Sequence, residues 1–244
     1  MTKRLAAVGL ITLALAAQPG SGVFRIQPVR PVAVLRAEAL AAKPPVERGN
    51  FRKSELVDLA LLDRRIRLDI RYATPDNFLS APVYTSARAF LQRPAAAALL
   101  RAHRELMKQG WGALIFDAYR PWYVTKIFWD ATPGDLHEFV ADPAQGSRHN
   151  RGCAVDLSLY DLITGREAEM TGVYDEMSKR SYPDYAGGTA EQRARRDLLR
   201  REMERQGFAV YSSEWWHFDY KDWKGYAIQN VPFERIAASR TGRP

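Results

Sequence analysis

Alternating apolar and polar residues predict several short β-strands in this chain. Residues 66–72 alternate in this way, and residues 154–160 do so most strictly, with Asp156 on the polar face. Residues 113–116 form a short apolar run, and residues 208–220 are rich in the aromatic residues that favour strands. We expect these segments to be the strands of a sheet.

Three other segments have the pattern of helices: residues 93–109, 122–131 and 189–206. The last of these begins with Thr189 and Gln192, which are spaced as a capping box, and it carries arginines opposite an apolar set. Strands and helices do not follow one another as regular βαβ units. We therefore predict an α+β fold with a mainly antiparallel central sheet flanked by helices.

The ends of the chain differ in pattern from its centre. Residues 1–17 join a short basic start to a 13-residue apolar stretch with small residues, which is typical of a secretory signal peptide. No other stretch approaches the roughly 20 apolar residues that span a membrane. Residues 18–50, rich in Pro and Ala, are predicted to be a linker or poorly ordered arm. Residues 51–233 would form the domain and residues 234–244 a basic tail.

These patterns predict an exported protein, periplasmic or otherwise extracytoplasmic, with no transmembrane segment once the signal peptide is removed. The formal charge of the 244 residues is +8, but residues 51–233 carry 26 basic and 25 acidic residues. The domain is therefore nearly neutral, and its charge gives no support to nucleic acid as a partner. The single cysteine, Cys153, excludes an internal disulfide and a zinc site built from several thiolates. The oligomeric state is not indicated.

Two segments carry residues that could hold a metal ion. One contains His149 and Asp156, and the other contains Glu214 and His217. Two histidines, one carboxylate and a water molecule form the open tetrahedral site expected for catalytic Zn²⁺. The remaining histidines, at positions 103 and 137, are expected to be exposed and not to bind metal.

Glu214 is the candidate general base, since a carboxylate near a ligand is within reach of a metal-activated water. Positions three apart in a regular strand face opposite ways, so Glu214 and His217 require a bulge or a helical turn between them. Arg120 follows Asp117 by three residues and precedes Pro121. It could donate to a developing oxyanion, or it could form only a structural ion pair with Asp117.

These residues resemble the signature of the zinc D-alanyl-D-alanine peptidases, a group that includes the hedgehog-type domains, and most closely the D-alanyl-D-alanine dipeptidases of the vancomycin-resistance type. The resemblance extends over roughly residues 52–225. The motifs that carry it are Ser147-x-His149-x-x-Gly152-x-Ala154-x-Asp156, Glu214-Trp215-Trp216-His217, Tyr72 to Phe78, Asp117-x-Tyr119-Arg120-Pro121, Asp156 to Tyr160, and Thr164-Gly165.

The resemblance implies one zinc ion per subunit, bound by His149, Asp156 and His217. It also implies that Glu214 is the catalytic base and that Arg120 stabilises the tetrahedral intermediate. The implied activity is hydrolysis of D-alanyl-D-alanine or a close D,D-dipeptide.

In that family both charged ends of the dipeptide are recognised. The matching positions are Tyr72 and Asp175 near the amine and Ser147 near the carboxylate. Core, surface and loop positions without function are the alternatives for these three residues. Two other functions remain open: a peptidoglycan D,D-carboxypeptidase or endopeptidase with the same metal centre, and a zinc-containing binding domain without catalysis.

Overall fold

The computed structural model describes residues 22–236. The predicted signal peptide, residues 1–17, lies outside this range, as do residues 237–244 of the predicted tail. Among the described residues, no helix has both the length and the apolar character needed to cross a membrane.

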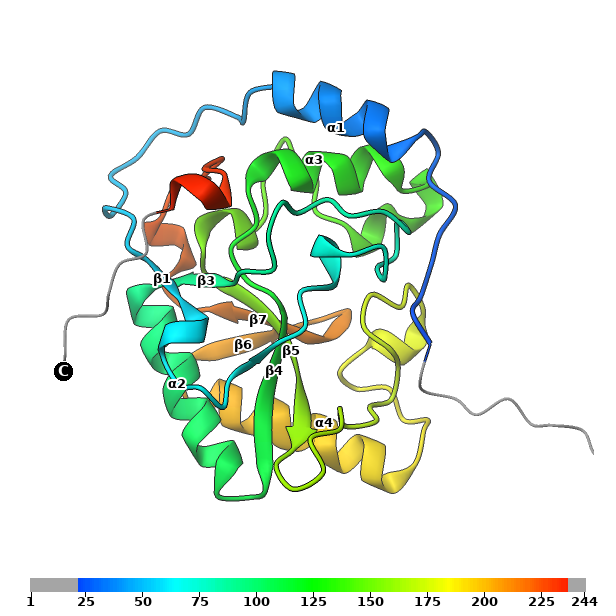
Figure 1. Cartoon of the computed structure of the whole chain (residues 1–244), viewed down its shortest axis with the longest axis vertical. Helices are drawn as coiled ribbons and strands as arrows, with labels where there is room; N and C mark the ends of the chain where they lie inside the picture. The colour runs from blue at the N-terminus through cyan, green and yellow to red at the C-terminus, as the bar shows by residue number, and fades with distance from the viewer. Residues whose placement is uncertain (1–21, 237–244) are drawn as a thin grey trace, which may run out of the picture.

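A five-stranded sheet forms the centre of the fold, in the strand order β2-β4-β5-β7-β6 (Figure 1). Only β2 and β4 run parallel, and every other neighbouring pair in this sheet is antiparallel. The bounds of the strands are Arg67–Leu68 for β2, Trp111–Asp117 for β4, Ala154–Asp161 for β5, Phe208–Tyr211 for β6 and Glu214–Tyr220 for β7. Strands β1 (Leu56–Asp58) and β3 (Phe90–Gln92) form a separate antiparallel pair. The predicted α+β class with a mainly antiparallel sheet is confirmed.

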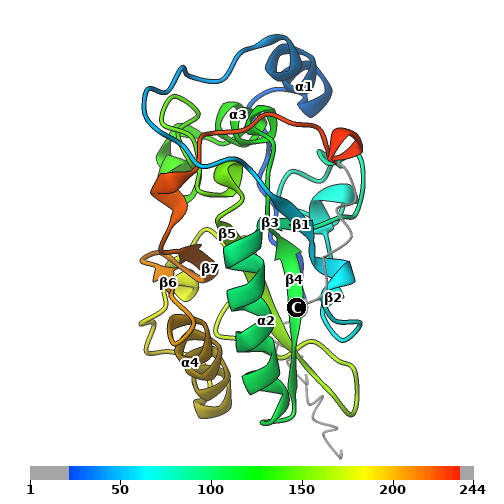
Figure 2. The same ribbon diagram turned by 90° about the vertical axis from the view of Figure 1, so that its left-hand side faces the viewer.

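Helices α2 (Arg93–Met107) and α4 (Ala190–Glu204) pack against each other and against the sheet, in the lower half of Figure 1. Figure 2 shows α2 lying along β4. The capping box predicted at Thr189 and Gln192 is present, with both reciprocal hydrogen bonds. Helix α3 (Trp122–Ala131) has the predicted bounds and lies at the opposite end of the molecule.

Helix α1 (Val32–Ala41) packs along α3, where the sequence predicts only a linker or poorly ordered arm over residues 18–50 (Figure 1). Two residues of α1, Leu35 and Ala39, are fully buried. The prediction is therefore wrong for residues 32–41. The apolar periodicity of α1 is weak because its buried face has only these two residues, and the surrounding alanines and prolines resemble a linker.

The rest of this N-terminal arm is bound to the domain by backbone and side-chain contacts. The backbone N–H of Ile26 donates to the carbonyl of Phe78 at 2.9 Å. Further along, the Glu47 carboxylate accepts from Arg151 Nη2 at 2.6 Å and from the backbone N–H of Ile228 at 2.6 Å. The arm therefore joins segments that are far apart in the sequence.

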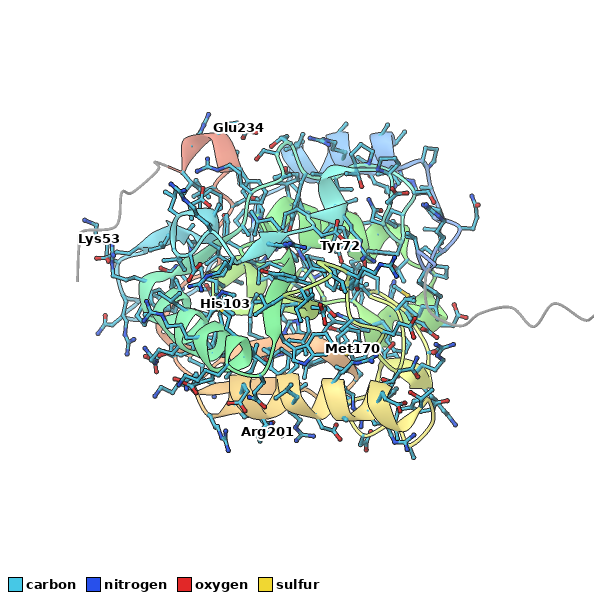
Figure 3. The ribbon with its side chains drawn as sticks, turned by 60° about the horizontal axis from the view of Figure 1, so that its bottom comes forward. Lys53, Tyr72, His103, Met170, Arg201 and Glu234 are labelled. Atoms are coloured by element: carbon cyan, nitrogen blue, oxygen red, sulfur yellow. The ribbon has the colours of Figure 1, made fainter. Side chains whose placement is uncertain are left out.

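His103 on α2 is fully buried, although the sequence predicts an exposed side chain (Figure 3). It lies four residues after Leu99 and three before Leu106, so it shares their buried helix face. Its Nδ1 accepts a hydrogen bond from the backbone N–H of Ala113 at 3.2 Å, and its Nε2 has no partner among the described residues. Charged residues elsewhere on the helix hide this face in the sequence.

Replacing His103 with Asn tests the energetic effect of this burial. Burial lowers the pKa of His103 below its ordinary value of 6.5, so on acidification the unfolded chain takes up a proton before the folded protein does. The stability that the neutral imidazole contributes is complete above pH 6.5, falls as the pH drops below it, and levels off below the folded-state pKa. We expect His103→Asn, whose Oδ1 can still accept from Ala113, to lack this loss. Urea unfolding between about pH 8 and pH 5 measures the difference, and parallel pH profiles would contradict it.

Candidate metal centre and active site

Strand pairing places two of the predicted metal ligands side by side. Asp156 on β5 lies directly opposite His217 on β7, and on its other side it lies opposite Asp117 on β4. Side chains of directly opposed residues point to the same face of a sheet. The three polar side chains therefore form a row across three strands, and His149, from the short 3-10 turn His149–Arg151, reaches the same place.

Three ligand atoms converge on one point. His149 Nε2 is 3.0 Å from His217 Nδ1 and 3.3 Å from Asp156 Oδ1, and the last two atoms are 3.0 Å apart. All three side chains are buried. Ligand atoms around a tetrahedral ion with bonds of about 2.0–2.1 Å would be about 3.3 Å apart. The triangle therefore has nearly the size that such an ion requires.

The protonation of both imidazoles is set by their other ring nitrogens. His149 Nδ1 lies 2.6 Å from the carbonyl oxygen of Ala118, which can only accept, so Nδ1 carries the proton. His217 Nε2 donates in the same way to Asp219 Oδ1 at 2.9 Å. Hydrogen bonds of this kind orient metal-binding histidines and fix their tautomer. In the neutral form of each imidazole, the remaining nitrogen therefore directs its lone pair into the triangle.

The centre of the triangle requires a positive charge. Asp156 Oδ1 is buried and has no hydrogen-bond donor among the described residues. Burial opposes a charge on His217, but the Asp219 and Asp156 carboxylates outweigh it and raise the pKa of His217 well above its ordinary value. Two imidazole nitrogens and a carboxylate oxygen without a donor are a donor set that fits a divalent metal ion.

Glu214 lies beside this triangle because β7 is bulged, as the sequence requires. Tyr211 pairs with Glu214 across a two-residue turn, but the preceding residue, Val210, pairs with Phe218. Three extra residues on β7 lie between these two pairs, which brings Glu214 Oε2 to 3.7 Å from His217 Nδ1. Burial raises the pKa of the Glu214 carboxyl to about 7. This carboxylate can therefore exchange protons near neutral pH.

Arg120 is held rigidly next to the metal ligands. Its Nε donates to Asp117 Oδ2 at 2.9 Å, and its Nη2 lies 2.8 Å from the same oxygen and 3.8 Å from Asp156 Oδ2. The other oxygen of Asp117 accepts from the Tyr84 hydroxyl at 2.6 Å. The ion pair that the sequence predicts is thus present. The guanidinium, only 8% exposed, also borders the cavity, which is compatible with the second role considered for it.

All eight predicted site residues line one cavity of about 270 Å³. They are Tyr72, Arg120, Ser147, His149, Asp156, Asp175, Glu214 and His217. The Tyr72 hydroxyl donates to Asp175 Oδ1 at 2.8 Å, whereas Asp175 Oδ2 is buried without a donor among the described residues. Burial raises the pKa of Asp175 well above its ordinary value. The Ser147 hydroxyl accepts from the backbone N–H of His149 at 3.2 Å.

Two residues that contact the ligands are missing from the sequence-based prediction. Asp219 orients His217, and the alternation of β7 could have identified it, because it lies two residues after His217 on the same face. Tyr174 donates from its hydroxyl to Asp156 Oδ2 at 3.0 Å. It belongs to a long connection without helix or strand periodicity, so no local pattern marks it.

A family model described as Peptidase M15, D-Ala-D-Ala dipeptidase, matches residues 52–236. The chain belongs to this D-Ala-D-Ala dipeptidase family. The metal triangle, the buried glutamate and the arginine all lie within the matched residues. The N-terminal arm, including α1 and Glu47, precedes them.

Several curated members of the D-Ala-D-Ala dipeptidase family are similar over most of their length. A D-alanyl-D-alanine dipeptidase of Escherichia coli strain K12 is 34% identical over 175 residues, which cover 72% of this chain and 89% of the relative. One from Enterococcus faecium is 36% identical and covers 64% and 87%. Among solved structures, the LdcB LD-carboxypeptidase aligns with 71% of each chain at 19% identity and a TM-score of 0.41, a likeness too distant to carry a functional inference.

The triangle predicts one bound divalent metal ion per chain in this D-Ala-D-Ala dipeptidase family member. We expect His149→Ala to weaken metal binding by more than roughly 10–100-fold, which is the typical effect of removing a hydrogen-bond partner of a ligand rather than the ligand itself. Competition with a chelator, followed by elemental analysis, measures this. His137→Gln is the matched control, since His137 stacks on Trp129 with ring centroids 3.8 Å apart and does not line the cavity. Equal metal affinity of both variants would contradict the assignment.

Proposed function

We propose that this chain is a zinc-dependent dipeptidase that hydrolyses D-alanyl-D-alanine or a close D,D-dipeptide. The observation that carries the proposal is the convergence of three buried ligand atoms with Glu214 and Arg120 around one small cavity. A binding domain without catalysis would require neither of these two residues. The names of the family and of its curated relatives support the same substrate.

Zinc is the proposed metal because two imidazoles and one carboxylate with an open position are the ligand set of catalytic zinc sites. When bound, zinc would polarise a carbonyl group and lower the pKa of a water molecule to about 7. His149, Asp156 and His217 would hold it. Ala118 and Asp219 keep the two imidazoles in the tautomer that binding requires.

The residues of the chain would then handle the proton and the developing charge. The Glu214 carboxylate accepts a proton from the water that attacks the scissile carbonyl carbon. It passes this proton to the leaving amine as the carbon–nitrogen bond breaks. The Arg120 guanidinium, held in place by Asp117, donates to the carbonyl oxygen as negative charge develops on it.

Recognition of the substrate would use its two charged ends. Asp175 offers a buried carboxylate oxygen without a donor, which suits a free ammonium group, and Tyr72 holds that carboxylate in place. Ser147 is the candidate contact for the free carboxylate. A longer peptide would place an uncharged amide next to the Asp175 carboxylate and leave that charge without an ammonium partner. Binding of longer peptides is therefore strongly disfavoured.

The proposed place of action is outside the cytoplasm, in the periplasm or its equivalent. The basic and apolar pattern of residues 1–17 supports export. A small dipeptide derived from the cell wall is a substrate consistent with that location. Neither the near-neutral domain nor the small cavity favours a nucleic acid as a partner.

Glu214→Gln tests the base. The amide keeps the shape of the side chain but cannot accept the proton, so we expect kcat for D-alanyl-D-alanine to fall by about 10³-fold with zinc content unchanged. Released alanine measures kcat, and elemental analysis measures zinc. Glu204→Gln is the matched control, because this exposed residue on α4 forms an ion pair with Arg200 and does not line the cavity. Full activity of metal-loaded Glu214→Gln would overturn the mechanism.

A panel of four substrates tests the proposed specificity. We expect D-alanyl-D-alanine to be cleaved with a kcat/KM at least 10²-fold above those of L-alanyl-L-alanine, N-acetyl-D-alanyl-D-alanine and a pentapeptide stem that ends in D-alanyl-D-alanine. Blocking the amine removes the partner of Asp175, and the stem peptide does not expose it. Cleavage of the stem peptide as fast as of the dipeptide would instead indicate a D,D-carboxypeptidase or endopeptidase.

A further inference from the structure

A series of three hydrogen-bonding contacts connects the residue proposed to bind the amine with a metal ligand. Asp175 Oδ1 lies 2.8 Å from the Tyr72 hydroxyl, and this hydroxyl lies 3.0 Å from that of Tyr174. Tyr174 in turn lies 3.0 Å from Asp156 Oδ2. Tyr72, Asp156 and Asp175 line the cavity, whereas Tyr174 lies behind them and does not. Of these four residues, Tyr174 is therefore the one that the substrate would not touch.

The ring of Tyr174 is fixed independently of its hydroxyl. It stacks on Phe116 with a centroid distance of 4.5 Å and an interplanar angle of 26°, and it meets Trp216 edge to face at 5.6 Å. These two residues directly precede Asp117 on β4 and His217 on β7. The ring is thus held by the strands that carry the site, and removing the hydroxyl alone should leave the ring where it is.

The hydroxyl has a defined direction of donation. An ionised carboxylate only accepts, so Tyr174 donates to Asp156 Oδ2, which leaves Oδ1 directed at the triangle. With its proton used in this way, the Tyr174 oxygen can accept from Tyr72. The Tyr72 hydroxyl therefore has two acceptors within reach, Asp175 and Tyr174, and it gives its single proton to one of them at a time.

The backbone at Asp175, where this series of contacts ends, is also unusual. Asp175 has a φ of 63°, a left-handed conformation that residues other than glycine rarely adopt. Neighbouring residues of an extended segment point in opposite directions, but this turn lets Tyr174 and Asp175 both face the site. Such strained backbone is concentrated at functional sites.

We propose that Tyr174 is a positioning residue that holds the metal ligand Asp156 and the amine-binding residue Tyr72 in register. Its hydroxyl fixes which oxygen of Asp156 faces the metal, and its oxygen, 3.0 Å from the Tyr72 hydroxyl, offers that hydroxyl a second acceptor next to Asp175. The second of these roles rests on the proposed dipeptidase function, whereas the first does not. No other side chain among the described residues contacts both Asp156 and Tyr72 by a hydrogen bond.

Tyr174→Phe in the full-length protein tests this role. We expect the zinc dissociation constant, measured by competition with a chelator without substrate, to rise about 10–100-fold. With zinc saturating, KM for D-alanyl-D-alanine should rise at least fivefold. Tyr72→Phe should raise KM in the same way but leave the zinc dissociation constant within twofold. The Tyr72 hydroxyl bonds to Asp175 and Tyr174 and not directly to a metal ligand.

Tyr160→Phe is the matched control. This tyrosine is also buried and lies on β5, the strand of Asp156, but its hydroxyl donates to the backbone carbonyl of Arg65 at 2.6 Å, away from the cavity. We expect it to change neither zinc affinity nor KM. Thermal unfolding of each variant separates a loss of stability from a loss of positioning.

The proposal is overturned if Tyr174→Phe leaves either the zinc dissociation constant or KM unchanged, because a purely structural tyrosine would lower only the unfolding temperature. Failure of the proposed function would look different. The wild-type protein would then bind zinc but would not release alanine from the dipeptide, and the zinc affinity of Tyr174→Phe would still report on the contact with Asp156.

Discussion

An excess of buried negative charge dictates what this cavity can bind. The carboxylates of Asp117 and Asp156 are buried there, and those of Asp175 and Glu214 line the cavity half-buried, next to the Arg120 guanidinium. Arg120 pairs with Asp117, one oxygen of Asp156 faces the two imidazoles, and one oxygen of Asp175 has no hydrogen-bond donor among the described residues. Buried carboxylates without partners are costly, and the raised pKa values of Asp175 and Glu214 express that cost. A metal ion at Asp156 and an ammonium group at Asp175 would relieve it, so one constraint accounts for cofactor and substrate together.

The sheet determines where each of these charges lies. Cross-strand pairing places Asp117, Asp156 and His217 in one row, and the spacing of such a row is fixed by the distance between hydrogen-bonded strands. Only the site residues that lie outside the row require special local structure. His149 comes from a 3-10 turn, and Glu214 comes from a bulged segment. Regular structure thus supplies precision, and the two irregular segments direct the remaining groups towards the row.

Residues whose role depends on short-range sequence could be predicted. The ligands His149 and Asp156 belong to one motif, Glu214 and His217 to another, and the need for a bulge between the latter pair follows from strand geometry alone. Features that depend on distant packing could not. Helix α1 is stabilised by its contact with α3 rather than by its own periodicity, and buried His103 lies on a helix that is otherwise rich in charge. Tyr174 could not be predicted for the same reason, since its partners come from four other segments.

The hairpin between β6 and β7 has a further consequence for how this family can diverge. Two turn residues separate the paired Tyr211 and Glu214, and three bulged residues separate Glu214 from the next pair. Losing one residue here would rotate His217 to the opposite face of the sheet, away from Asp156. We therefore expect changes of side chain in this hairpin to be tolerated better than changes of its length. Differences in length between relatives should accumulate instead in segments such as the N-terminal arm, whose ends can move without disturbing the register.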